Sequence, residues 1–338
     1  MMLFRPACAR DLQEINALAM GSGIGITTLP KDRALLNKRL AQSQASFNPS
    51  IISPGNEYYL FILEDPATGH VAGTAAIEAM TGIDAPFYSY KRQTCIKTCS
   101  SLGIQNKQDY LSLVHDNQGR TEICTLYLDP AYRRHGNGLL LSLARFFFMA
   151  QYPARFAPTV IAEMRGISDD QGHSPFWDAV GYPFFHMSFT QADQLTISNN
   201  KQFIADLMPD HPIYLNLLPQ AAQEVIGHTH ASTVPAMTIL LREGFKHNQT
   251  VHIFDAGPTL EVARDKIRTL ARSQLMPLTI TTEELHNHHV LLANTQLDFR
   301  ATISSATLNT AEQTCHLSPL TADLLHLSNG DFVRASIV

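Results

Sequence analysis

The stretch Arg133-Arg134-His135-Gly136-Asn137-Gly138 decides the fold because of what stands on either side of it. A strand-like run, residues 122–128, precedes it, and a long apolar run, residues 139–150, follows it as a predicted helix. Glycines at the start of a helix let the backbone approach a ligand, and the first-turn N–H groups have no partner within the helix. Those donors, the helix dipole and two arginines favour an anion, most often a phosphate. The alternative is a polar loop that caps the helix, with Gly136 present only for a turn.

The residue order in this loop differs from the two best-known phosphate-binding motifs. A P-loop ends in Gly-Lys-Ser/Thr and a dinucleotide fingerprint reads Gly-x-Gly-x-x-Gly, whereas this loop reads Arg-x-x-Gly-x-Gly. Preceded by a strand that ends in Leu-Asp-Pro at residues 128–130, the loop resembles the pyrophosphate loop of the GNAT-type N-acyltransferases. Those enzymes bind acyl-coenzyme A.

Composition narrows the class of protein. The chain has 338 residues, 45% of them hydrophobic and 16% charged, which is typical of a well-packed soluble protein. Its net charge of −5 argues against a nucleic-acid partner. No apolar run reaches membrane-spanning length, and the amino-terminal residues lack the pattern of a signal peptide. The five cysteines are scattered, which predicts reduced thiols in the cytoplasm; Cys95 and Cys99 have no second pair nearby, so no metal site is predicted.

The order of predicted elements matches the N-acyltransferase layout. We expect a strand at residues 3–6, helices at 11–20 and 31–45, and a hairpin of strands at 58–63 and 70–78. Residues 80–120 form a long polar insertion, which is more often functional or an interface than idle. A strand at 159–164 and a helix at 174–181 complete the first copy of the pattern.

A second helix with early proline and a terminal Gly-aromatic pair spans residues 233–245, and a strand is predicted at 251–255. The fold class is therefore α/β (α+β), a GNAT-type N-acyltransferase-like mixed sheet flanked by helices. We expect an acyl-CoA-binding domain at residues 1–190, a second, degenerate acyltransferase-like half at 191–275, and a small β-rich appendage at 276–338.

An acyl transfer from a thioester to an amine needs an acid that protonates the leaving thiolate. In many N-acyltransferases a tyrosine four residues before the Gly-aromatic pair supplies it, but here those positions hold Trp177 and Leu240. The best substitute is His230, in a loop just before the second helix, because histidine titrates near neutral pH. His228 is the runner-up, and a capping or surface role is the alternative for both.

Three further positions are candidates for binding. Leu126 lies on the strand before the loop, where main-chain groups would hold the pantetheine arm, although a buried core leucine would look the same. Glu78 and Glu163 end apolar strands and could bind a basic substrate; an internal arginine such as Arg165 is the alternative partner. Cys124 is interpreted as a small core residue rather than a covalent acyl carrier.

Segments along nearly the whole chain resemble the bacterial arginine N-succinyltransferase family. The matching sequence segments are residues 124–130, 136–138, 160–166, 174–177, 207–214, 225–227 with His230, 243–245 and 253–261. Two departures are Ala231, where a proline is expected, and Arg134-His135, where a Lys-Glu-type pair is expected.

The resemblance implies succinyl-CoA as co-substrate, with no permanently bound cofactor, and L-arginine as acceptor, giving N2-succinylarginine and CoA. It implies that His230 is the proton donor and that Leu126 contacts succinyl-CoA. Coenzyme contacts are expected from Leu126, Arg133, Arg134, Gly136, Asn137 and Gly138, and acceptor contacts from Glu78 and Glu163. A homo-oligomer is expected, or a paired arginine/ornithine succinyltransferase in which this chain is one subunit. A non-catalytic acyl-CoA sensor is the remaining alternative.

Overall fold

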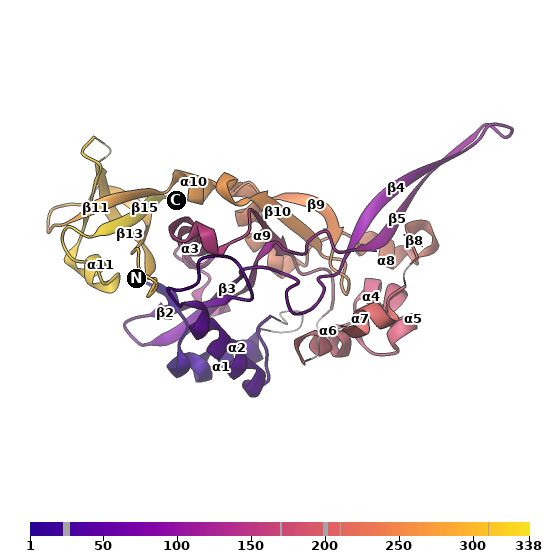
Figure 1. The fold of residues 1–338 in the computed structure, drawn as a ribbon, viewed down its shortest axis with the longest axis horizontal. Coiled ribbons are helices and arrows are strands. Elements are labelled where there is room, and N and C mark those ends of the chain that lie inside the picture. Colours follow the sequence, from indigo (N-terminus) through magenta and orange to yellow (C-terminus); the bar gives the residue numbers. More distant parts are fainter. Residues whose placement is uncertain (23–27, 170, 199–201, 210, 310) are drawn as a thin grey trace.

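The computed structural model describes residues 1–22, 28–169, 171–198, 202–209, 211–309 and 311–338. The molecule is elongated, with both termini toward one end and a long hairpin, β4 (Ser89–Cys99) and β5 (Ile104–Val114), projecting from the other (Figure 1). The polar insertion predicted at residues 80–120 therefore contains a β-ribbon with eleven paired positions.

The first half of the chain confirms the expected order of strand, two helices, hairpin, strand, loop and helix. Besides the projecting hairpin, its elements are β1 (Leu3–Pro6), α1 (Leu12–Gly21), α2 (Arg33–Ser46), β2 (Tyr58–Asp65), β3 (His70–Glu78), β6 (Thr121–Leu128), α3 (Asn137–Gln151) and β7 (Thr159–Glu163).

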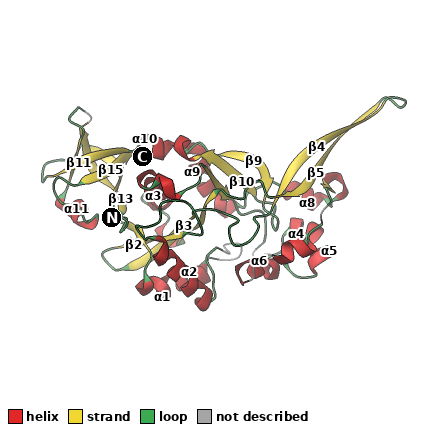
Figure 2. Cartoon of the chain, in the orientation of Figure 1, coloured by secondary structure: helices red, strands yellow, loops and turns green. Residues whose placement is uncertain are grey.

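The second half is more broken, with short helices between its strands (Figure 2). Its elements are α4 (Pro175–Val180), α5 (Tyr182–Phe185), α6 (Phe189–Ser198), α7 (Gln202–Leu207), β8 (Ile213–Tyr214), α8 (Gln220–Val225), α9 (Val234–Arg242), β9 (Lys246–Val251), β10 (Pro258–Ala263), α10 (Arg268–Arg272), β11 (Gln274–Ile280), β12 (Asn287–Ala293), β13 (Ala301–Asn309), β14 (Thr314–Leu317), α11 (Pro319–Leu324) and β15 (Phe332–Ile337). The domain boundaries expected at residues 190 and 275 stay a prediction.

Across the described residues the strands form one mixed sheet in the order β12-β15-β11-β14-β13-β1-β2-β3-β6-β7-β10-β9-β4-β5-β8. Most neighbours are antiparallel; β6 and β7 run parallel, as do β11 and β14. A parallel pair needs a crossover connection, and α3 provides it between β6 and β7. The expected mixed sheet flanked by helices is confirmed.

Helices cover both faces of the central strands. Along β2, the side chains of Tyr58, Leu60 and Ile62 pack toward α1 and α2, whereas those of Tyr59 and Phe61 pack into the core that contains α3. This alternation follows from the two-residue period of a strand. Because both faces are buried, the strand reads in the sequence as a continuous apolar run.

The strand predicted at residues 251–255 is wrong beyond its first residue. β9 ends at Val251, and a turn follows in which the Asp255 carboxylate accepts the Gly257 N–H at 3.0 Å. Ile253 and Phe254, whose apolar side chains suggested the strand, instead pack into the cluster around Trp177, with 5.2 Å between the Phe254 and Trp177 ring centroids.

A buried ion pair ties β1 to the residues before α1. The Arg5 guanidinium donates from both terminal nitrogens to Asp11, each at 2.8 Å, and from Nε to Glu64. Burial alone would raise the pKa of Asp11, but hydrogen bonds from Arg5 and the Cys8 amide lower it below its ordinary value of 3.8. The carboxylate therefore stabilises the folded state above that pH, and this contribution is lost as the pH falls through the lowered pKa.

Replacing Asp11 with asparagine should lower the free energy of unfolding by about 3 kcal/mol at neutral pH, because it leaves Arg5 buried without its bidentate partner. Urea unfolding at neutral pH and in acid measures the free energy of unfolding. The difference in this free energy between the variant and the wild type should be smaller in acid. Arg10→Gln is the matched control, because Arg10 Nε also lies 3.8 Å from Asp11 Oδ1 but its side chain is 71% exposed, and an exposed ion pair contributes little. Equal stability of the two variants would contradict the assignment.

Candidate active site

The loop after β6 is shaped as an open helix mouth. Gly136 adopts a left-handed conformation with φ of 77° immediately before α3, which glycine tolerates without a Cβ penalty. Arg133 and Arg134 are exposed beside it, and Arg133 Nε donates to the Leu128 carbonyl at 3.1 Å. The amide of Gly138 lies in the first helical turn, where no acceptor exists within the helix. The geometry suits an anion such as a pyrophosphate.

Asn137 plays a different part from its neighbours. Its side chain is buried, and its amide donates to the Tyr132 carbonyl at 3.0 Å. Its backbone N–H donates to the Arg134 carbonyl at 3.1 Å. The Asn137 side chain therefore holds the loop in shape, while exposed contacts come from the residues around it.

β6 is irregular where the sequence analysis placed Leu126. Thr125 has a φ of +55°, and the register with β3 shifts between the pairs Ala76–Cys124 and Thr74–Tyr127. The ladder with β7 comprises Thr121–Val160 and Glu122–Ile161 at the start of the two strands. Leu126 is half-buried against the core that contains α3, so both the core and the binding interpretations of this residue are compatible with its position.

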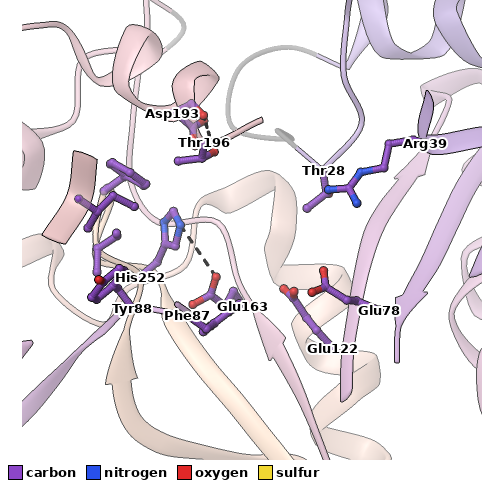
Figure 3. A pocket seen from close by; sticks show the side chains of 13 residues that line it. Thr28, Arg39, Glu78, Phe87, Tyr88, Glu122, Glu163, Asp193, Thr196 and His252 are labelled. Atoms are coloured by element: carbon purple, nitrogen blue, oxygen red, sulfur yellow. Dashed lines mark hydrogen bonds and ion pairs between the residues drawn. The ribbon is translucent and has the colours of Figure 1, made fainter. Parts of the chain in front are cut away.

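An acidic cavity of about 110 Å³ brings together the two predicted carboxylates (Figure 3). Glu78 ends β3, Glu122 lies directly opposite on β6, and Glu163 ends β7. Like charges opposite each other on neighbouring strands repel, so the site favours a cation. The lining side chains are Thr28, Arg39, Glu78, Phe87, Tyr88, Glu122, Glu163, Asp193, Thr196, Ile204, His252, Ile253 and Phe254.

His252 lies at the Glu163 end of this cavity (Figure 3). Its Nδ1 is 3.0 Å from Asp255 Oδ1, and its Nε2 is 3.9 Å from Glu163 Oε2. Burial alone would lower the pKa of His252, but the charges of Glu163, Asp255 and Asp193 outweigh it and raise the pKa to about 10. The ring is therefore an imidazolium at neutral pH and balances part of the negative charge of the cavity.

Two glycines allow the His252 turn to lie directly against the end of β7. A Cβ on Gly166 would be 2.1 Å from the Asp255 carbonyl oxygen, and a Cβ on Gly257 would be 1.9 Å from that of Met164. The Gly166 N–H donates to Asp255 Oδ2 at 2.8 Å. The close approach of these backbones fixes Glu163 and His252 in one site.

His230 lies beside this junction rather than among the residues that line the cavity. Its backbone N–H donates to the Arg165 carbonyl at 2.9 Å, and its ring caps the turn at residues 231–233. Nδ1 accepts the Ser232 N–H at 3.2 Å, so the neutral ring carries its proton on Nε2. His228, the runner-up, is exposed.

The residues weighed as alternatives have contacts of their own. Arg165 donates to Ser168 at 2.9 Å, and the ion pair described for Glu163 is with His252. Cys124 is buried in the core beneath α1 and α2, and burial raises the pKa of its thiol, which disfavours the thiolate that acyl transfer would need. Trp177 is buried and donates from its indole to the Met187 carbonyl at 3.0 Å.

Models of one protein family match both parts of the chain. The model described as arginine N-succinyltransferase beta subunit matches residues 2–269, and that of its C-terminal domain matches residues 274–336. The chain belongs to the arginine N-succinyltransferase family.

Individual members of the arginine N-succinyltransferase family are similar over nearly the full length. The arginine N-succinyltransferase of Citrobacter koseri is 40% identical, with 94% of this chain and 95% of that one covered, and that of Photorhabdus laumondii is 40% identical, with 99% and 97% covered. The solved structure of arginine/ornithine succinyltransferase subunit AI from Pseudomonas aeruginosa superimposes with a TM-score of 0.91 at 37% identity, covering 100% of this chain and 98% of that one. The protein is an acyltransferase.

Sequence reasoning missed Arg39, Glu122, Asp193 and His252 in this member of the arginine N-succinyltransferase family. Glu122 gave a usable signal, since it stands as a lone charge in an apolar strand opposite the end of β3. His252 and Asp193 gave none, because tertiary packing alone brings α6 and the turn after β9 to β7.

Two further features are absent from the described ranges. No helix there is long and apolar enough to cross a membrane. No group of three or more His, Cys, Asp or Glu side chains there could hold a metal ion.

Proposed function

We propose that this protein transfers the succinyl group of succinyl-CoA to the α-amine of L-arginine, giving N2-succinylarginine and CoA. The observation that carries the choice of acceptor is the meeting of Glu78, Glu122 and Glu163 in one cavity. A guanidinium is planar and binds a carboxylate through two parallel hydrogen bonds. Membership of the arginine N-succinyltransferase family supports the same acceptor.

The coenzyme would bind along β6 and at the mouth of α3. Its pyrophosphate would accept hydrogen bonds from the exposed Arg133 and Arg134 and from first-turn amides near Gly138. Gly136 and Asn137 would keep the loop open for this contact. The pantetheine arm would then run back toward the bulge at Thr125 and Leu126, where the register between β6 and β3 shifts.

In the reaction, the deprotonated α-amine of arginine attacks the thioester carbonyl and forms the C–N bond. The nitrogen then loses a proton to solvent, the C–S bond breaks, and the CoA thiolate takes up a proton from the donor. Without a tyrosine at position 177 or 240, His230 is the candidate donor. Its Nε2–H tautomer, set by the contact of Nδ1 with Ser232, holds the transferable proton on the nitrogen that faces away from the cap.

Thiol release from succinyl-CoA by the purified chain, measured against a panel of amino acids, tests the function directly. L-arginine should give the highest kcat/KM, with L-ornithine and L-lysine as basic comparisons and L-leucine as a neutral control. Coenzyme binding without thiol release would point to an acyl-CoA sensor. Release that begins only when a second chain is added would indicate one subunit of a paired arginine/ornithine succinyltransferase.

Removing the charge of Glu78, Glu122 or Glu163 by substitution with glutamine should raise KM for arginine about 10–100-fold, the range for losing a hydrogen bond to a charged group. Glu261→Gln, on the neighbouring β10 but outside the cavity lining, is the matched control and should leave KM unchanged. Unchanged KM in all three cavity variants would remove the acidic cavity as the acceptor site.

His230→Ala should lower kcat about 10²–10⁴-fold, the usual range for loss of acid–base help. His228→Ala, two residues earlier in the same loop and exposed, should turn over near the wild-type rate. Steady-state thiol release at saturating substrates separates the two. The reverse result, loss of kcat in the His228 variant alone, would assign the donor to the runner-up.

A further inference from the structure

The acyl group of succinyl-CoA ends in a free carboxylate, and a buried arginine in α3 has no assigned role. Arg5, Arg145 and Arg155 are the fully buried arginines among the described residues. Arg5 is paired with Asp11 and Glu64. Arg155 donates to the carbonyls of Ser46 and Asn48, which tie down the chain after α2.

Arg145 differs from the other two because its own helix supplies its hydrogen-bond acceptors. Nε donates to the Ser142 carbonyl at 3.1 Å, and Nη2 donates to Ser142 Oγ at 3.3 Å. Within the described ranges Nη1 donates to no protein acceptor, and no carboxylate forms an ion pair with Arg145. Nη1 is not among the fully enclosed side-chain atoms that lack a partner, so this end of the guanidinium borders accessible space. The side chain is 1% exposed, and burial lowers the pKa of Arg145.

Keeping a guanidinium buried without a counter-charge is costly. Desolvation of an ion in a protein interior costs several kcal/mol, which a partner of opposite charge normally offsets. The planar donors of an arginine match a carboxylate, so an anionic ligand with that geometry would relieve the cost.

The position of Arg145 along α3 fits the acyl end of the coenzyme. The helix starts at the loop and runs back beside β6, on which it packs. Eight residues of helix place Arg145 about 12 Å from Asn137, and four residues of strand place Cys124 about 13 Å from Leu128. By this count along the two elements, Arg145 is level with Cys124. Leu126 and the bulge lie between that level and the loop.

We infer that Arg145 binds the free carboxylate of the succinyl group and so selects succinyl-CoA among acyl-coenzyme A thioesters. The inference rests on the proposed function. Three other arginines lie elsewhere. Arg133 and Arg134 are exposed in the loop before α3. Arg39 lines the acidic acceptor cavity, and its guanidinium lies 4.6 Å from the centroid of the Tyr58 ring.

The test compares succinyl-CoA with butyryl-CoA, which has the same four-carbon acyl chain without the charge. In Arg145→Met, kcat/KM for succinyl-CoA should fall about 10²–10³-fold, the range for losing one partner of a buried charge pair. The variant should use butyryl-CoA at least as well as the wild type does. The selectivity ratio, which is kcat/KM for succinyl-CoA divided by kcat/KM for butyryl-CoA, should therefore fall by at least the same factor. Arg39→Met is the matched control, because it should alter KM for arginine and leave the ratio unchanged.

A second variant covers the case in which Arg145→Met does not fold. Arg145→Lys keeps the charge but loses the planar fork, so its selectivity ratio should lie between wild type and Arg145→Met. A wild-type ratio in a folded variant of either kind would overturn the inference. Failure of the wild type to release thiol from succinyl-CoA with any amino acid would instead overturn the proposed function, so the two failures are distinguishable.

Discussion

The close contact between the end of β7 and the turn after β9 is the constraint on which the site depends. Gly166 and Gly257 have no side chains, and the Asp255 carboxylate accepts a hydrogen bond from each of their backbone amides. This contact sets His252 against Glu163 and lets the loop with His230 hydrogen-bond to Arg165. Residues about 90 positions apart in the sequence are thereby held together by close backbone packing and by one buried carboxylate.

The sheet separates two electrostatic environments. Toward α2, the cavity gathers carboxylates from three adjacent strands, with the His252 imidazolium and Arg39 at its edges. Toward α3, the core is aromatic and contains Arg145, which has no carboxylate partner in the described structure and donates to Ser142 of its own helix. Under the two proposals above, a cationic acceptor and an anionic acyl group would approach β6 from regions of opposite charge. Electrostatics would then sort the two substrates before any contact specific to their shapes.

Much of the first half could be predicted from the sequence, because local patterns and packing agree there. The Gly-rich loop, the alternating apolar β2 and the capped helices each specify their own conformation. The hairpin of β4 and β5 could not be predicted, because both of its faces are largely exposed and polar and no two-residue apolar period marks it. The strand predicted at residues 251–255 is wrong for the opposite reason, since two apolar side chains in a turn resemble those of a strand. Arg145 left a clear but unused signal, a lone charge inside an apolar helix.

The position of β1 has a consequence for how the protein is made. β1 lies between β2 and β13, with Phe4 opposite Ala301 and the Thr302 hydroxyl donating to the Met2 carbonyl at 2.7 Å. Phe299 packs edge-on against Phe4 at 6.2 Å between ring centroids. On the ribosome, β1 therefore keeps the edge that pairs with β13 uncovered until some three hundred more residues have been translated. The nascent chain must carry that open edge until β13 has emerged.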